Sequence, residues 1–345
     1  MSALRLSICI ATLNRAAFLS ETLEALVRQA TDEVEIVVVD GASTDHTPEV
    51  VQGYARRCPR VRYVRLEAKG GVDKDYCLSV DHAQGDYCWL FTDDDLLKPG
   101  AVAAVLQAMC DNPGLIIVNA EVRTADLAVC LQARRIKFEQ DRDYALSASE
   151  EGHRLLADTA DYLSFIGGVV IRRDIWNQRK KEPYYGTEFV HVGVIFQCPI
   201  PGIVRVMAYP WIIIRYGNAL WVSRHFQIWM FKWPNLVWSF PDFPDWAKER
   251  VVAREPWRHW PILALYRAME RYSLKEYTEW LESRLSCRLR KFVCRGIAQA
   301  PVSLLNRLAR WYVQLRMRNR PCITLCDLDA WREQQRRKST LPPAG

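Results

Sequence analysis

Hydrophobic residues in the first hundred positions form short continuous runs, separated by stretches in which they recur at helical spacing. After the first run, Leu19, Leu23 and Leu26 follow one another at intervals of three or four, which is typical of one face of a helix. The strand-like runs lie at residues 6–12, 35–40, 60–66 and 87–92. Strands that alternate with helices predict an α/β fold with a doubly wound, mostly parallel sheet.

The pattern changes in the second half of the chain. Beyond Gly114 the strand-like and helix-like segments alternate less regularly, and from about Trp221 the chain is rich in tryptophan and basic residues without strand alternation. We therefore expect two parts. Residues 1–217 would form the α/β domain, and residues 218–345 an aromatic-rich, basic, mainly helical region.

The net charge of +7 is concentrated in this C-terminal region. Residues 246–345 carry 21 Lys and Arg against 9 Asp and Glu, a net charge of +12, whereas residues 1–245 carry −5. An apolar stripe at helical spacing, next to four arginines, comprises Leu304, Leu305, Leu308, Trp311, Tyr312 and Leu315, with Arg307, Arg310, Arg316 and Arg318. Such a helix is typical of segments that lie on an anionic membrane surface, and an ordinary packed helix is the alternative.

Other features narrow the class of protein. No recognisable nucleic-acid-binding module accompanies the basic charge, so no nucleic-acid partner is expected. The eleven cysteines are scattered without paired CxxC spacing, which favours reduced thiols over disulfides or a metal centre.

No apolar run has the length of a signal peptide or a membrane span. We expect a cytoplasmic location, with peripheral placement on the inner face of the membrane as the open alternative.

Carboxylates directly follow two of the predicted strands. In doubly wound sheets, ligands bind beyond the carboxyl ends of the strands, where Asp40 and the run Asp93, Asp94 and Asp95 would lie. Three adjacent carboxylates raise one another's pKa unless a cation lies among them. Mn²⁺ or Mg²⁺ suits such a site, because these ions take oxygen ligands and keep positions for phosphate oxygens. A solvated turn that caps the next helix is the alternative.

Asp40 leads into the turn-rich sequence GASTD. Its carboxylate could accept hydrogen bonds from a base N–H or from ribose hydroxyls, whereas Ser43 to Asp45 are more typical of a turn. The chain has no GxxxxGK[ST] or GxGxxG loop, so neither an ATPase nor a dehydrogenase is supported.

Three segments carry a resemblance to a known family. SICIATLNR, EIVVVDGASTDHT and GDYCWLFTDDDLLKPGAV resemble the donor-binding half of glycosyltransferase family 2, which has the GT-A fold, and within it the abequosyltransferase-like members of O-antigen synthesis. The resemblance covers residues 5–110 strongly and extends weakly to about 217.

The resemblance implies a site for a nucleotide-diphosphate sugar and its metal ion. Thr12, Asn14 and Arg15 match the loop that faces the nucleotide, Asp40 matches the residue that contacts base or ribose, and Lys69 to Asp73 match the segment near the base and diphosphate. Counting back from Pro99, Thr92 replaces the usual first Asp of the metal motif. The metal contact then falls on Asp94, with Asp93 near the ribose or metal. Asp95 would either support these ligands or be an alternative ligand itself.

The family also implies a catalytic base. Inverting members use a carboxylate from a later G-x-E-D-like segment, and GTEFVHV follows GGVVIRRDIW at the corresponding position, which makes Glu188 the candidate. Phe189 stands where the family has Asp, so His191 is kept as the alternative base. Arg215 follows the apolar run PWIII and could reach the diphosphate or the acceptor.

We therefore expect an inverting, metal-dependent glycosyltransferase that acts on a saccharide or lipid-linked saccharide acceptor in surface polysaccharide synthesis. One alternative is an inactive sugar-nucleotide-binding or membrane-scaffold protein. A sugar nucleotidyltransferase is less favoured, because it would carry a Gly-rich basic loop after the first strand, where LNRAAF stands.

Overall fold

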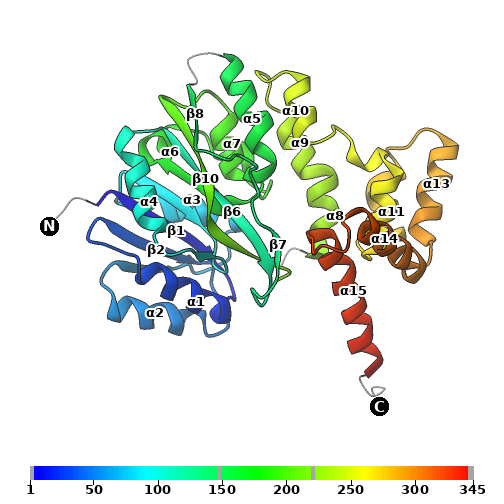
Figure 1. The fold of residues 1–345 in the computed structure, drawn as a ribbon, viewed down its shortest axis with the longest axis horizontal. Coiled ribbons are helices and arrows are strands. Elements are labelled where there is room, and N and C mark those ends of the chain that lie inside the picture. Colours follow the sequence, from blue (N-terminus) through cyan, green and yellow to red (C-terminus); the bar gives the residue numbers. More distant parts are fainter. Residues whose placement is uncertain (1–3, 146–148, 219–221, 341–345) are drawn as a thin grey trace. The chain divides into compact units, whose positions relative to one another are not determined.

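The computed structural model describes residues 4–145, 149–218 and 222–340. Trp221, where the sequence changes character, lies outside these residues. The chain divides into two compact units (Figure 1). The first comprises Met1–Val122, Ala133–Arg215 and Leu236–Val252, and the second comprises Arg123–Gln132, Tyr216–Asn235 and Ala253–Gly345. One break thus falls close to the predicted boundary at residue 217, but each unit also takes a segment from the other side of it.

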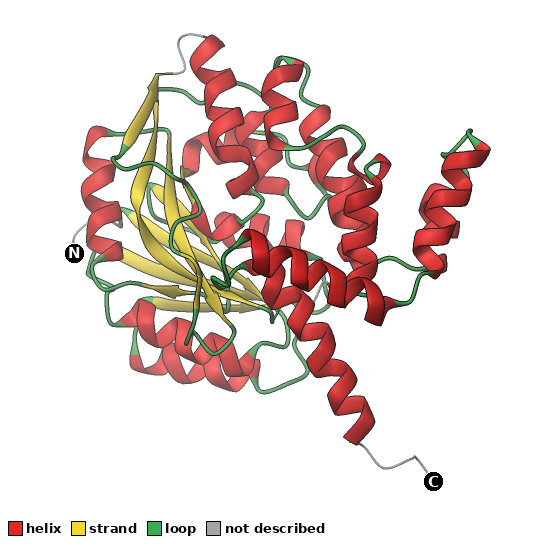
Figure 2. Cartoon of the chain, turned by 45° about the vertical axis from the view of Figure 1, so that its right-hand side comes forward, coloured by secondary structure: helices red, strands yellow, loops and turns green. Residues whose placement is uncertain are grey.

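A sheet with strand order β3-β2-β1-β4-β9-β6-β10-β5 organises the first unit. Its parallel half consists of β1 (Leu6–Thr12), β2 (Val34–Asp40), β3 (Val61–Arg65) and β4 (Tyr87–Phe91). β1, β2 and β4 are buried along almost their whole length, as strands covered on both faces should be. The predicted α/β fold is confirmed, and Figure 2 shows helices on both sides of the sheet.

Three helices connect the four parallel strands, and a fourth follows Pro99. They are α1 (Ala16–Val27), α2 (Thr47–Arg57), α3 (Val72–Asp81) and α4 (Ala101–Ala108), followed by a short 3₁₀ turn over Met109–Asp111. In α1 the stripe Leu19, Leu23 and Leu26 is fully buried. Thr47 begins α2 with Pro48 in its first turn, where the missing N–H of proline costs nothing.

The other half of the sheet contains antiparallel pairs. β9 (Val169–Arg172) runs antiparallel to both β4 and β6 (Leu115–Thr124), and β10 (Ile203–Tyr216) runs antiparallel to β5 (Leu96–Leu97) and β8 (Arg142–Ala145). The short β7 (Cys130–Gln132) pairs with β6. The helices here are α5 (Ser149–Leu163), α6 (Arg173–Gln178), α7 (Val190–Phe196) and α10 (Asp245–Val251), with 3₁₀ turns at Ile166–Gly168 and Glu182–Tyr184.

The second unit is mainly helical, which confirms the predicted helical C-terminal region. It contains α8 (His225–Gln227), a π-helical turn over Ile228–Lys232, the start of α9 (Trp233–Trp238), α11 (Trp260–Ala268), α12 (Leu274–Glu276), α13 (Arg288–Gln299), α14 (Val302–Arg316) and α15 (Ile323–Thr340), with shorter turns at Val222–Arg224, Pro256–Arg258 and Tyr277–Leu281. Its aromatic core includes Phe226 stacked on Tyr272, with ring centroids 5.1 Å apart. Among the described residues, no helix combines the length and apolarity needed to cross a membrane.

Candidate active site

The carboxyl ends of the parallel strands bring the predicted donor-site residues to one edge of the sheet. Thr12 and Asp40 are register partners at the ends of β1 and β2. β4 pairs with the other side of β1 and ends at Phe91, so the run from Asp93 to Asp95 begins just beyond it. Asp40 and the run from Asp93 to Asp95 therefore lie at the same edge of the sheet, on strand ends that flank β1.

Arg15 lies between two of these carboxylates. Its guanidinium forms an ion pair with Asp94, and its Nε lies 3.4 Å from Asp93 Oδ1. The Arg15 side chain is 7% exposed and those of Asp93 and Asp94 are each 16% exposed. Burial, followed by the charge of Asp94, raises the pKa of Asp93 to about 7, and Arg15 opposes this shift. The pKa of Asp93 thus remains raised although Arg15 contacts its carboxylate.

Asp95 fastens the acidic turn to β10. One of its oxygens accepts a hydrogen bond from the Arg215 backbone N–H at 2.7 Å, and the other accepts one from the Thr92 hydroxyl. The side chain of Arg215 donates to the carbonyl of Asp94 at 3.0 Å and forms an ion pair with Glu21 of α1. Asp95 and Arg215 thus join three elements and fix the position of Asp94.

The carboxylate of Asp40 is fully buried and both its oxygens are engaged. Oδ1 accepts from the Ser43 N–H at 2.8 Å, and Oδ2 accepts from the Tyr63 hydroxyl at 2.6 Å. Burial and the adjacent carboxylate raise the pKa of Tyr63, so this tyrosine stays a donor. Asn14 supports the same loop: its side-chain oxygen accepts from the Thr44 N–H at 2.8 Å, and its N–H donates to Ser43 Oγ at 2.8 Å.

Asp73 holds the loop that carries Glu188. Its carboxylate accepts the backbone N–H groups of Gly186 at 2.8 Å, Glu188 at 3.0 Å and Val190 at 3.0 Å. Asp73 is 5% exposed, and burial raises its pKa although the three N–H groups oppose the shift. Both oxygens of Asp73 thus face the loop, and a contact of Asp73 with the nucleotide stays a prediction. The contacts unite α3 with the start of α7.

His191 occupies a different environment from Glu188. It is 1% exposed, its Nε2 lies 2.7 Å from the Leu163 carbonyl, and burial lowers its pKa to about 4. Nε2 must therefore carry the hydrogen, and the ring is neutral near pH 7. Glu188 is only partly buried and has a positive φ of 76°. The geometry favours Glu188 over His191 as a group that can meet a substrate.

Sequence reasoning missed several residues of this site. Tyr63 and Glu21 lie on β3 and α1, where alternation alone could not distinguish them from surface residues. Asp75 of α3 is 5% exposed and lies under the loop that bears Lys69. A Cβ atom on Gly70 of this loop would lie only 2.4 Å from Asp75 Oδ1. Lys69 itself is exposed.

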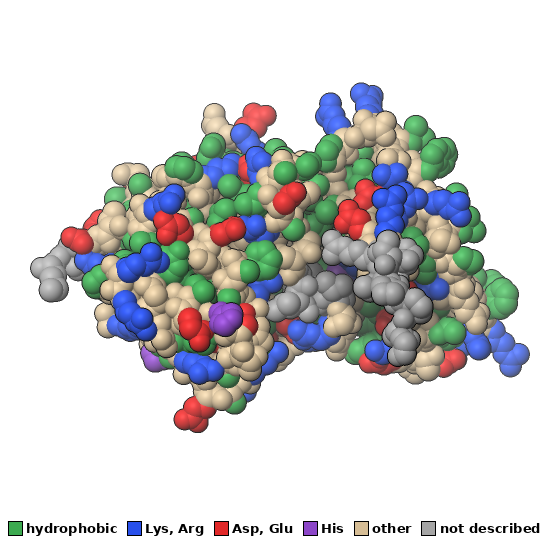
Figure 3. Space-filling model, turned by 90° about the horizontal axis from the view of Figure 1, so that it is seen from below, with side chains coloured by type: hydrophobic (Ala, Val, Ile, Leu, Met, Phe, Trp, Pro, Cys, Tyr) green, Lys and Arg blue, Asp and Glu red, His purple; other side chains and the backbone are tan. Residues whose placement is uncertain are grey.

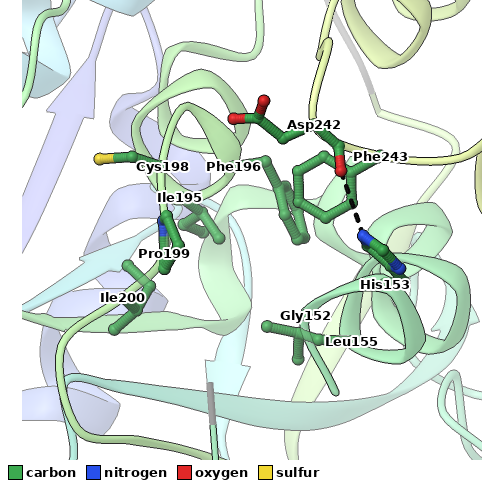
Figure 4. Close-up of a pocket in the computed structure, with 10 residues that line it drawn as sticks. All are labelled: Gly152, His153, Leu155, Ile195, Phe196, Cys198, Pro199, Ile200, Asp242 and Phe243. Atoms are coloured by element: carbon green, nitrogen blue, oxygen red, sulfur yellow. Dashed lines mark hydrogen bonds between the residues drawn. The ribbon is translucent and has the colours of Figure 1, made fainter. Parts of the chain in front are cut away.

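An apolar pocket of about 180 Å³ lies apart from these groups (Figure 4). Phe196 and Phe243 form part of its wall, and His153 contacts the Asp242 carbonyl at 3.1 Å. None of the predicted site residues lines this pocket, so its chemistry does not bear on the donor site.

The strand order and the acidic strand ends define a GT-A type of fold. The structure resembles that of residues 1–349 of TarS from S. aureus, with a TM-score of 0.54 and 14% identity over 97% of this chain and 92% of that one. It also resembles the mannosyltransferase PcManGT from Pyrobaculum calidifontis, with a TM-score of 0.50 and 15% identity over 97% and 87% of the two chains. At these identities the likeness concerns the fold.

Residues 7–172 match the family model described as glycosyl transferase family 2. The chain thus contains a glycosyltransferase family 2 domain, as its resemblance implied. The abequosyltransferase RfbV of Salmonella typhimurium is 27% identical over 224 residues, which are 62% of this chain and 67% of RfbV. A GalNAc(5)-diNAcBac-PP-undecaprenol beta-1,3-glucosyltransferase of Campylobacter jejuni is 30% identical over 104 residues, 30% of this chain and only 34% of that protein.

Proposed function

We propose that this protein transfers a sugar, with inversion, from a nucleotide-diphosphate sugar to a saccharide or lipid-linked saccharide acceptor in surface polysaccharide synthesis. The observation that carries the proposal is that Asp93 and Asp94 both contact Arg15 just beyond β4, at the edge of the sheet where β2 ends in Asp40. Two of the TarS structures contain UDP or UDP-GlcNAc, and the PcManGT structure contains GDP-Man and Mn²⁺. These ligands support the class of donor.

The acidic pair fits a divalent cation. Among the described residues, no group of three or more His, Cys, Asp or Glu side chains could enclose a metal ion. Mg²⁺ and Mn²⁺ at nucleotide sites need only one or two carboxylates, because phosphate oxygens and water complete their coordination. Asp94 and Asp93 would hold the ion, and Asp95 would position them through Thr92 and Arg215. The bound ion would neutralise the diphosphate leaving group.

Glu188 is the proposed general base. It would take the proton of the acceptor hydroxyl as that oxygen attacks the anomeric carbon, and the bond to the nucleotide diphosphate would break on the opposite side. A single displacement of this kind inverts the anomeric configuration. Asp73 fixes the backbone of the loop through three hydrogen bonds, so the position of Glu188 is set before substrate binds.

A lipid-linked acceptor would place the reaction at the inner face of a membrane. The Campylobacter relative bears a name that includes an undecaprenol carrier, and RfbV is named an abequosyltransferase. Acceptor and donor sugar are proposed here only as classes.

The test is calorimetric titration of nucleoside diphosphates with Mn²⁺ or with EDTA. We expect tighter binding with Mn²⁺ in the natural protein, and the same affinity with and without metal in Asp94→Ala, because the carboxylate that contacts the ion is lost. Asp94→Asn serves as a second variant that keeps the side-chain volume beside Arg15. Asp32→Ala is the matched control, since Asp32 is 87% exposed and remote from the pair.

Two outcomes would contradict the assignment. If the natural protein bound the nucleoside diphosphate equally well with EDTA and with Mn²⁺, the proposed metal site would be wrong. Binding without any release of nucleoside diphosphate from a panel of nucleotide sugars and acceptors would instead favour an inactive sugar-nucleotide-binding protein.

A further inference from the structure

The helical unit exposes large hydrophobic side chains on two of its helices. On α13, Leu289 is 70% and Phe292 78% exposed. On α14, Leu308, Trp311 and Leu315 are 53%, 65% and 67% exposed. Nine of the fifteen large hydrophobic side chains that the described part of the chain exposes lie between Leu289 and Met317. Scattered exposed hydrophobics need no explanation, but a concentration of this kind does.

These side chains are not the core face of either helix. α13 buries Cys294 and Ala298 in the aromatic core, whereas Leu289, Phe292 and Val293 recur at helical spacing on the remaining surface. α14 buries Asn306, which donates hydrogen bonds to the carbonyls of Ala268 and Leu328. Both helices are therefore anchored by one side and carry a second, apolar side that the unit does not cover.

The stretch of sequence that bears these apolar sides is basic. Between Ser283 and Cys326 the sequence has ten Lys and Arg and no Asp or Glu. Arg288, Arg290 and Arg295 on α13 are exposed, as are Arg307 and Arg316 on α14. On the face seen in Figure 3, hydrophobic and basic side chains are interspersed on the right of the view, with some acidic ones among them. Arg310 differs, because it forms an ion pair with Asp329 at 2.7 Å.

We propose that the exposed faces of α13 and α14, called here the basic apolar faces, bind an anionic lipid bilayer. The apolar side chains would enter the interfacial region while the flanking arginines contact the headgroups, which is how amphipathic helices lie on membranes. A second copy of the chain is a poorer occupant, because an isologous interface would bring two such positively charged surfaces together. This binding is independent of the proposed catalysis.

The experiment is co-sedimentation of the full-length protein with vesicles. One set contains phosphatidylcholine alone, and the other has about one third phosphatidylglycerol, which supplies the negative surface potential. We expect binding to the anionic set only, and weaker binding at about 0.5 M salt, where the Debye length shrinks to a few ångströms.

Two variants separate the hydrophobic and electrostatic contributions. Phe292→Ser/Trp311→Ser removes two side chains that are mostly exposed, so folding should be retained. Trp246→Ser is its control, because Trp246 is 50% exposed on α10 in the other unit. Arg307→Gln/Arg316→Gln/Arg318→Gln removes charge and spares Arg310. Each multiple variant should lower the partition coefficient at least about tenfold, since several charges or anchors are lost together.

Each result decides for or against the proposal. Equal sedimentation with both vesicle sets, or with neither, would overturn it. So would variants that bind as well as the natural protein while their melting temperatures are unchanged. If analytical ultracentrifugation finds a dimer that Phe292→Ser/Trp311→Ser dissolves, a second copy occupies the faces instead. Donor binding by calorimetry is measured on the same samples, so that loss of membrane binding is distinguished from loss of the proposed activity.

Discussion

The backbone of Glu188 adopts the left-handed region that glycine usually occupies, with φ at 76°. Such a conformation in a non-glycine residue costs roughly 1–3 kcal/mol and persists only where neighbouring contacts impose it. The hydrogen bond from its N–H to Asp73 is one such contact. Strain held in this way at the edge of a candidate site is consistent with a functional residue.

For Glu188→Gln we expect donor binding to be kept and turnover to fall by about 100-fold or more, as loss of a general base should cause. Transfer assays and calorimetry on the same samples measure the two quantities. Glu182→Gln is the control, because Glu182 is exposed in the preceding turn. A normal turnover in Glu188→Gln combined with an inactive His191→Ala would assign the base to His191.

The position of single carboxylates could be predicted, but their partners could not. Asp40 and the run after β4 follow apolar strands, and strand ends of a parallel sheet meet at one edge. The hydrogen bond from Tyr63 to Asp40 and the ion pair between Arg215 and Glu21 join residues that are 23 and 194 positions apart. Local spacing contains no information on such pairs.

At the scale of elements, hydrogen bonds from the loop before α7 to Asp73 join this loop to α3. Asp73 stands in the first turn of α3, so sequence reasoning placed it beside the nucleotide, whereas its partners lie at least 113 residues further along the chain. The acceptor capacity of two carboxylate oxygens satisfies three loop N–H groups. An amide in this place offers only one accepting oxygen.

We therefore expect Asp73→Asn to lower turnover while the affinity for nucleoside diphosphate changes little, because the loop that carries Glu188 loses part of its support. Asp81→Asn, at the exposed far end of α3, is the matched control. A double-mutant cycle gives the sharper measurement. If Asp73 acts through Glu188, adding Asp73→Asn to Glu188→Gln has little further effect on turnover, whereas fully additive losses would show an unrelated role.

On the scale of the whole molecule, each unit contains one histidine whose pKa is lowered, a fully buried one in the first unit and a partly buried one in the second. Burial lowers the pKa of His191 to about 4 in the first unit and that of His225 to about 3 in the second. An unfolded histidine takes up its proton near pH 6.5. Between about pH 6.5 and these lowered values the unfolded chain binds protons that the folded protein does not, so these groups make the free energy of unfolding fall as the pH falls.

The expected contribution of each histidine is at most about 1.4 kcal/mol per pH unit within that window. Buried carboxylates such as Asp93, whose pKa is raised to about 7, act in the opposite direction, so variants must be compared with the natural protein. His191→Gln can still donate to the Leu163 carbonyl and should flatten the slope between pH 4 and 6.5 in denaturant unfolding. His46→Gln, at an exposed position, is the matched control substitution.

The assignment of chain segments to the two units was the feature hardest to predict from the sequence. The predicted C-terminal region, residues 218–345, includes residues 226–240, but the structure divides them between the units. Phe226 lies in the helical core, whereas the ring centroid of Phe240 lies 6.0 Å from that of Phe196 of α7. Apolar periodicity indicates that a helix buries one face, and it does not say in which core.

The return of residues 236–252 to the first unit makes both units discontinuous in the gene. The ring centroids of Phe243 and Phe196 are 5.7 Å apart, and α10 packs on α5 with Ala247 fully buried. A recombination event with a single joint after residue 217 would therefore replace residues 236–252 together with the helical unit. The first unit would lose this segment, and the aromatic side chains that pack against it would be exposed. Exchange of the helical unit between related genes requires joints on both sides of this segment, and so the two units are expected to be inherited together.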